Sequence, residues 1–257
     1  MPDELPPDAE DGRSRSRSRR WLVLGVVAMM LAAAGGVTAW RSVRSSPAQA
    51  VGEAPTYVDE SAEAGVDHSY MGDSDYFVGG GVAVFDCNDD GRADLFFAGG
   101  DGPAALYRNE SAVGGTLRFE RVTSAVTDLS AVTGAYPLDV DSDGTMDLAV
   151  LRRGANLMLR GLGECRFDDA TRTFDLDAGD EWTTAFSATW EATNGLPTLA
   201  FGNYRTLEED ACAAGQLVRP TPEGDAYDAP MSLAPGFCTL SMLFSDWDRS
   251  GRRDLRV

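Results

Sequence analysis

The stretch VAVFDCNDDGRADLFF, residues 82–97, places a polar loop between two apolar runs. Asp86, Asn88, Asp90 and Asp94 put side-chain oxygens at loop positions 1, 3, 5 and 9, and Gly91 stands at position 6. Alternate residues of a tight loop can point at one centre, and Ca²⁺ takes about 6–8 oxygen ligands. Glycine at position 6 allows the sharp turn that exposes the carbonyl of position 7. The stretch therefore predicts a calcium loop.

The same spacing recurs twice, and each ninth residue is an aspartate followed by leucine. The further copies are Asp139, Asp141, Asp143, Gly144 and Asp147, and then Asp246, Asp248, Ser250, Gly251 and Asp254. An EF-hand needs a glutamate at position 12 and flanking helices, whereas that position holds Phe97, Val150 and Val257. The flanks are short runs rich in Val, Phe and Leu, so we expect strand–loop–strand sites.

The loops mark an internal repeat of about 50 residues. A degenerate copy starts at Trp190; it keeps Gly195 but only Asn194 among the ligands, and we expect it to have lost its metal. Candidate third strands are Leu106–Asn109, Met158–Gly161 and Leu217–Pro220, and candidate fourth strands are Tyr57–Ser61, Phe119–Thr123 and Phe167–Thr171. Four strands per repeat are typical of a β-propeller blade. The alternative is a β-sandwich, which does not usually repeat a metal loop at near-constant spacing.

The composition is acidic, with a formal net charge of −19 over 257 residues. Such a surface argues against a nucleic-acid partner, because phosphate binding needs clustered basic residues. The four cysteines permit disulfides in an exported protein, and Cys212–Cys238 is the first-choice pair. Cys87 occupies loop position 2, so its side chain should point away from the metal. A zinc site is disfavoured, since no CxxC occurs and His68 is the only histidine.

The N-terminal part predicts a membrane anchor. Residues 1–20 form a polar, arginine-rich tail, residues 21–40 are apolar and uncharged, and residues 41–55 form a small-residue linker. Twenty helical residues span about 30 Å, which crosses a bilayer core. The preceding arginines favour a cytoplasmic N-terminus and an exported remainder. The alternative is a signal peptide cleaved near Ala50 and a secreted product.

The sequence resembles the FG-GAP/VCBS-type repeats of integrin-α-like propellers, and most closely bacterial relatives of cartilage acidic protein. The resemblance rests on Gly79–Asp86, Leu106–Asn109, Phe119–Thr123 and Phe237–Asp248, and it covers residues 56–257. It implies an all-β, seven-bladed propeller with Ca²⁺ in several loops. About three and a half blades are present, so we expect a fragment of a longer propeller.

The resemblance also implies a set of calcium ligands. The side-chain ligands are those of the three loops above. The backbone carbonyls of Arg92, Thr145 and Arg252 complete them.

We expect a membrane-anchored, extracytoplasmic interaction or adhesion module that binds an unidentified protein or carbohydrate. No catalytic motif stands out, so no enzyme activity is predicted. The alternative is a partial domain of a secreted glycan-active enzyme, since paired carboxylates can cleave glycans. We expect His68 to be a surface residue, and we expect a solvated turn at Asp177, Asp180 and Glu181.

Overall fold

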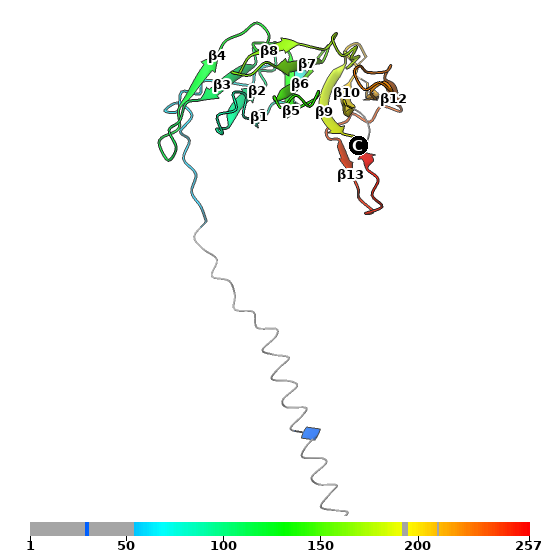
Figure 1. Ribbon diagram of the computed structural model, residues 1–257, viewed down its shortest axis with the longest axis horizontal. Helices are drawn as coiled ribbons and strands as arrows, with labels where there is room; N and C mark the ends of the chain where they lie inside the picture. Colours follow the sequence, from blue (N-terminus) through cyan, green and yellow to red (C-terminus); the bar gives the residue numbers. More distant parts are fainter. Residues whose placement is uncertain (1–28, 31–53, 192–194, 210) are drawn as a thin grey trace, which may run out of the picture. The chain divides into compact units, whose positions relative to one another are not determined.

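The computed structural model describes residues 29–30, 54–191, 195–209 and 211–257 (Figure 1). Contacts divide the chain into two units, Met1–Val58 and Asp59–Val257. Most of the predicted tail, span and linker, residues 1–55, lies outside the described residues. Within the part of the chain that is described, no helix is both long and apolar enough to cross a membrane. The anchor at residues 21–40 stays a prediction.

The second unit is built from antiparallel strands after one short 3₁₀ helix, η1 (Ser74–Tyr76). The first sheet runs in the order β1 (Val82–Phe85), β2 (Asp94–Phe97), β3 (Ala105–Asn109) and β4 (Phe119–Val122). The second sheet repeats this order with β5 (Val132–Leu138), β6 (Asp147–Arg152), β7 (Leu157–Gly161) and β8 (Phe167–Asp169). The predicted strand–loop–strand arrangement around the first two loops is confirmed.

Two further sheets continue the series. The third contains β9 (Trp182–Thr189), β10 (Thr198–Arg205), β11 (Gly215–Val218) and β12 (Met231–Leu233), and the fourth contains β13 (Leu243–Ser245) and β14 (Asp254–Arg256). The all-β prediction is confirmed. One expected strand is wrong: Tyr57–Ser61 is not a strand, because it pairs with no strand in the described part of the chain. The described sheets form an open series and not a closed ring (Figure 1).

Neighbouring sheets pack through alternating side chains of the same strand. On β6, Leu148 and Val150 join the core shared with the first sheet, whereas Ala149 and Leu151 join the core shared with the third. Successive strand residues point to opposite faces. Since both faces are covered, the strand is a continuous apolar run, as in other sheets buried on both sides. This stacking is the packing expected of propeller blades.

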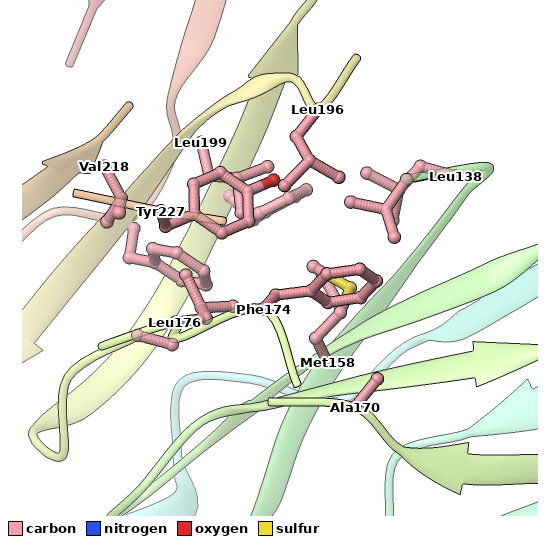
Figure 2. Packing of buried hydrophobic residues seen from close by; sticks show 14 of the residues in the cluster. Leu138, Met158, Ala170, Phe174, Leu176, Leu196, Leu199, Val218 and Tyr227 are labelled. Atoms are coloured by element: carbon pink, nitrogen blue, oxygen red, sulfur yellow. The ribbon is translucent and has the colours of Figure 1, made fainter. Parts of the chain in front are cut away.

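Among the described residues, the largest hydrophobic core cluster lies between the second and third sheets, and aromatic side chains fill part of it (Figure 2). Phe174 and Leu176 come from the segment that joins β8 to β9, and they pack among Met158 of β7, Leu199 of β10 and the buried Tyr227. The connection between two sheets therefore supplies part of the core that holds them together.

In the described part of the chain, one face of the first sheet has no neighbouring sheet. Val82 and Val84 of β1 are 46% and 53% exposed, although the intervening Ala83 is buried. Leu95 and Phe97 on β2, which pair with Val84 and Val82, are half-buried. In the second sheet, the corresponding face is the one that packs against the first sheet. The first sheet thus presents an apolar face of the kind that another sheet covers.

Candidate metal centres in the repeated loops

The three acidic loops share one backbone conformation. Each lies between the first and second strands of a sheet, and positions 4 and 6 both have positive φ. At position 4 these residues are Asp89 (59°), Ser142 (62°) and Arg249 (58°), and at position 6 they are Gly91 (78°), Gly144 (88°) and Gly251 (82°). No atom lies within 4 Å of a Cβ built on any of the three glycines. Glycine is therefore required for its φ and not for space.

The aspartate at position 1 folds each loop. Its Oδ2 accepts the backbone N–H of the glycine five residues later, at 2.7 Å in the first loop, 3.0 Å in the second and 2.9 Å in the third. In the first two loops, Oδ1 also accepts the N–H of position 5, from Asp90 to Asp86 at 3.2 Å and from Asp143 to Asp139 at 3.1 Å. The carboxylate thus sits inside the turn, which is where a ligand is needed.

The aspartate at position 9 is buried in the first two loops. Oδ2 of Asp94 accepts the N–H of Cys87 at 2.8 Å, and Oδ2 of Asp147 accepts the N–H of Val140 at 2.7 Å. Both side chains are fully buried. Burial raises the pKa of Asp94, and burial together with the charges of Asp141 and Asp143 raises the pKa of Asp147 to about 6, against the lowering effect of its backbone N–H partners. Carboxylates held in this way are stabilised in their ionised form by a cation.

The second loop brings three predicted ligands together. Carboxylate oxygens of Asp139, Asp141 and Asp147 all lie within 4.8 Å of one another. Burial and the charge of Asp143 also raise the pKa of Asp141. Asp143 itself is exposed and accepts the N–H of Thr145, the position-7 residue, at 2.7 Å. The centre of this loop is therefore a cluster of oxygens whose mutual repulsion a divalent cation would relieve.

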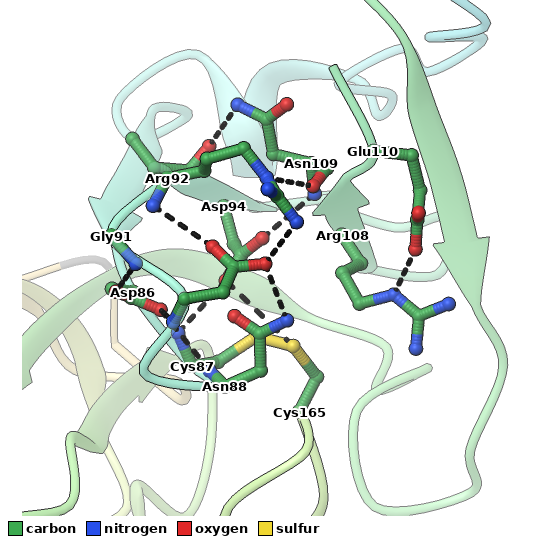
Figure 3. The surroundings of a disulfide bond; sticks show 12 residues. Asp86, Cys87, Asn88, Gly91, Arg92, Asp94, Arg108, Asn109, Glu110 and Cys165 are labelled. Atoms are coloured by element: carbon green, nitrogen blue, oxygen red, sulfur yellow. Dashed lines mark hydrogen bonds and ion pairs between the residues drawn. A yellow bond between two sulfur atoms is a disulfide. The ribbon is translucent and has the colours of Figure 1, made fainter. Parts of the chain in front are cut away.

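The first loop is partly neutralised by its own side chains (Figure 3). Asp90 accepts hydrogen bonds from Nδ2 of Asn88 at 2.8 Å and from the guanidinium of Arg92 at 2.5 Å. Although desolvation opposes it, these donors lower the pKa of Asp90 below its ordinary value. Oδ1 of Asn88 is buried and has no hydrogen-bond partner. The loop holds an oxygen at position 3 that is not used by the protein itself.

The third loop is more open. Asp246 and Asp248 keep their turn hydrogen bonds, and the N–H of Arg252 donates to Oγ of Ser250 at 3.4 Å. Asp254, unlike Asp94 and Asp147, is exposed. The structure therefore gives position 9 of this loop no buried anchor.

Residues 86–150 match the family model of the FG-GAP-like repeat. This segment runs from the first aspartate of the first loop into β6, the strand that follows the second loop. Cartilage acidic protein 1 of Mus musculus is 34% identical over 94 residues, and that of Homo sapiens is 33% identical over 94 residues. The match covers 36% of this chain, but only 14% and 13% of those two proteins. The predicted resemblance to FG-GAP-like repeats is confirmed for this segment, and a resemblance to bacterial relatives stays a prediction.

The degenerate copy departs from the FG-GAP-like loops as expected. Thr198 replaces the buried aspartate, and its hydroxyl donates to Oε1 of Glu191 at 2.7 Å. The guanidinium of Arg219 lies 3.5 Å from the same Glu191 oxygen. Asn194, the one retained ligand, lies outside the described residues. The loss of metal from this copy stays a prediction.

Both disulfides are formed, although only one pair was predicted. Cys212–Cys238 is confirmed, and it joins the β10–β11 loop to the segment before β13. Cys87 bonds to Cys165, 78 residues away in the β7–β8 turn of the next sheet. Nothing local in the sequence indicates this pair, since pairing among four cysteines is not encoded in their spacing. Its only sequence signal is a cysteine at loop position 2.

Among the other acid–base candidates, His68, Asp177 and Glu181 have structural partners. Nε2 of His68 lies 2.7 Å from the carbonyl oxygen of Ala98, and its ring packs on Phe97. His68 is thus half-buried and not a free surface residue. Glu181 accepts the N–H of Leu207 at 2.9 Å and, with Asp180, lines an open groove of about 230 Å³. Asp177 accepts the N–H of Gly179 at 3.1 Å, as in a turn.

Proposed function

We propose that residues 56–257 form a calcium-stabilised part of a β-propeller that serves as a non-catalytic interaction module. The observation that carries the proposal is the oxygen cluster of Asp139, Asp141 and Asp147 in a loop whose backbone is repeated twice elsewhere. Calcium would act as a structural ion, holding the acidic loop between the first two strands of the first, second and fourth sheets.

The donor set favours calcium over other cations. Carboxylates, an amide and backbone carbonyls are hard oxygen ligands, which suit Ca²⁺ and Mg²⁺, whereas zinc prefers nitrogen and sulfur. Ca²⁺ tolerates irregular geometry with 6–8 ligands, while Mg²⁺ demands a near-ideal octahedron. The unpartnered Oδ1 of Asn88 fits this role in the first loop.

The exposed apolar face of the first sheet favours a propeller that has more blades than the four described sheets. The exposed Val82 and Val84 lie on the face that, in the second sheet, packs against a neighbour. A further blade on this face would bury these valines with Leu95 and Phe97. We propose the seven-bladed arrangement that the FG-GAP resemblance implies.

We propose that the module lies outside the cytoplasm. Disulfides persist in oxidising compartments and are rare in the cytosol, and both pairs are formed here. The apolar segment 21–40 would anchor the chain, with its N-terminus in the cytoplasm; cleavage near Ala50 would instead secrete it. Carbonate extraction of membranes distinguishes these products, because an anchored chain stays in the pellet and a secreted one is found in the medium.

A second candidate is a partial domain of a glycan-active enzyme. It is favoured by the groove of about 230 Å³, whose lining includes Asp180, Glu181, Glu208 and Glu209. Paired carboxylates are the usual machinery of glycoside cleavage. Release of sugars from a glycan by the purified chain would support this candidate, and capture without turnover would support the interaction module.

The proposal is tested by counting bound calcium in the full chain by equilibrium dialysis. We expect two or three ions per chain, and the loss of one ion in each of Asp86→Asn and Asp139→Asn, which change the position-1 aspartate of the first and second loops. Asp89→Asn is the matched control, because Asp89 is an exposed residue of the first loop that is not a predicted ligand and asparagine tolerates its positive φ. No bound calcium at millimolar free ion, or an equal loss in the control, would contradict the proposal.

A further inference from the structure

The Cys87–Cys165 disulfide is built into the first acidic loop. Cys87 occupies loop position 2, and Cys165 belongs to the β7–β8 turn of the next sheet. The N–H of Cys165 also donates to the carbonyl oxygen of Cys87 at 3.0 Å. One covalent bond and one hydrogen bond therefore fasten this loop to the neighbouring sheet.

The disulfide lies against the buried ligand of the loop (Figure 3). Sγ of Cys165 is 3.7 Å from Oδ2 of Asp94, the oxygen that accepts the N–H of Cys87 at 2.8 Å. Both cysteines and Asp94 are buried. The sulfurs thus close one side of the Asp94 carboxylate, while the Asn109 N–H holds Oδ1 at 2.7 Å.

The turn that carries Cys165 is held in an unfavourable backbone conformation. Gly163, Glu164 and Cys165 are three successive residues with positive φ, at 72°, 53° and 55°. This conformation is unfavourable for residues with a Cβ, such as Glu164 and Cys165. The links to Cys87 counteract this cost, so breaking the disulfide should let the turn relax away from the loop.

The second loop shows the same design without a disulfide. Val140 stands at position 2, and its N–H donates to Oδ2 of Asp147 at 2.7 Å. The N–H of Gly161 holds the other oxygen at 2.8 Å. In the second loop, backbone bonds position the ninth residue without a disulfide. In the first loop, by contrast, the surroundings of the ninth residue depend on the redox state of two cysteines.

We propose that the Cys87–Cys165 disulfide is a redox-controlled positioning element for cation binding in the first loop. The inference rests on the proposed calcium function and adds its regulation. With the disulfide formed, Asp94 and the loop are held in place before the ion arrives. With it broken, binding must also order the loop and the turn, which weakens affinity because ordering costs entropy.

The switching step is thiol–disulfide exchange with an external dithiol. The dithiol attacks one sulfur, the Cys87–Cys165 bond breaks, and a mixed disulfide forms. The second thiol of the same dithiol then attacks this mixed disulfide. The reagent becomes a cyclic disulfide, and the protein is released with both cysteines reduced. The dithiol is oxidised by two electrons, and Cys87 and Cys165 each gain one electron and one proton.

The first test measures calcium affinity by titration calorimetry. The full chain carries Asp139→Asn and Asp246→Asn, which remove the position-1 carboxylate from the second and third loops, so that the first loop is the intact site under test. We expect Cys87→Ser with Cys165→Ser to weaken binding about fivefold or more. The matched control, Cys212→Ser with Cys238→Ser, removes the other disulfide and should change affinity less than about twofold.

The outcomes separate the inference from the proposed function. Equal weakening in both cysteine pairs, or no weakening in either, would overturn the inference while calcium binding stands. Binding in the natural chain but none in the background variant would also overturn it, because the first loop would then not be a site. No binding in the natural chain would overturn the calcium proposal itself.

A second test needs no variant that might misfold. Coupling is reciprocal, so calcium must protect the disulfide by the same factor by which the disulfide strengthens calcium binding. The natural chain is equilibrated with dithiothreitol in excess calcium or in EDTA, alkylated, and analysed by peptide mass spectrometry. We expect reduction of Cys87–Cys165 to be suppressed about fivefold or more by calcium, relative to Cys212–Cys238 in the same sample. Equal reduction in calcium and EDTA would overturn the inference.

Discussion

The backbone N–H of Asn109 donates a 2.7 Å hydrogen bond to Oδ1 of Asp94, joining the end of the first loop to the third strand of its sheet. Gly161 and Asp147 make the same contact at 2.8 Å in the second sheet. The buried ninth residue therefore has two roles: it ties the loop to β3 or β7, and it places a carboxylate at the proposed metal centre. An aspartate in this position is needed by the fold as well as by the ion.

Asp147→Asn should destabilise the calcium-free chain by about 1–3 kcal/mol. The two carboxylate oxygens of Asp147 each accept a buried backbone N–H, whereas the NH2 group of asparagine cannot accept one of them. The free energy of unfolding is measured by urea titration in EDTA. Asp143→Asn is the control: Asp143 is exposed, and its Oδ1 can still accept the Thr145 N–H. An equal effect of both substitutions would argue against the structural role of Asp147.

Calcium binding in the second loop should weaken as pH falls through about 6. Burial, with the nearby charges of Asp141 and Asp143, raises the pKa of Asp147 to about 6 from 3.8. The calcium-free fold thus binds this proton more tightly than the unfolded chain. The resulting stabilisation is complete below about pH 4 and is lost as pH rises through about 6.

The same proton competes with the cation. The rise in melting temperature caused by calcium should be larger at pH 7.5 than at pH 5, as measured by thermal melts with and without calcium at both values. Asp147→Asn should reduce this dependence, and the remainder should come from the other carboxylates with raised pKa, such as Asp94. A calcium effect that is constant between pH 7.5 and 5 in the natural chain would contradict the assignment.

Arg92→Thr should strengthen calcium binding in the first loop by about two- to fivefold. The guanidinium of Arg92 is bonded to Asp90 at 2.5 Å, so it competes with a cation for that carboxylate. Exposed ion pairs contribute about 0.2–1 kcal/mol. Threonine is the residue that the second loop carries at the same position, Thr145, so the substitution keeps the repeat's own chemistry. Weaker binding, measured by calorimetry, would show that Arg92 supports the site.

Two glycines of the second sheet should differ in their tolerance of alanine. Gly144→Ala should cost about 1 kcal/mol, because φ is 88° but no atom lies within 4 Å of the new Cβ. Gly161→Ala should cost about 3 kcal/mol, since its Cβ would overlap the Met146 carbonyl oxygen. Urea titration in EDTA measures both values. The reverse order would contradict the described loop geometry.

The acidic loops were predictable because their chemistry is local. Ligand spacing, the glycine at position 6 and the short apolar flanks all lie within one stretch, such as residues 82–97. The same spacing also gave the strands β1 and β2 correctly. The positive φ at position 4 was not predicted. The three loops carry different residue types there, Asp89, Ser142 and Arg249, so no shared residue type indicates this conformation.

Contacts between sheets were not predictable from local patterns. Cys87 meets Cys165 only because the second sheet packs on the first, and the sequence spacing of 78 residues says nothing of that. One of the two backbone donors to Asp94, and one of the two to Asp147, likewise comes from the third strand of the sheet. Tyr57–Ser61 looked like a strand because it resembles β4 and β8, but a strand also needs a hydrogen-bonded neighbour.

The most direct test of the account is a thermal melt of the full chain in excess EDTA, in 10 mM Ca²⁺ and in 10 mM Mg²⁺, where the ion concentrations are about ten times a typical extracellular dissociation constant. The account predicts a rise of about 5 °C or more with Ca²⁺, little change with Mg²⁺, and loss of the rise in Asp86→Ala with Asp139→Ala. A cooperative melt with the same midpoint in EDTA and in Ca²⁺ would contradict the claim that these loops are structural calcium sites.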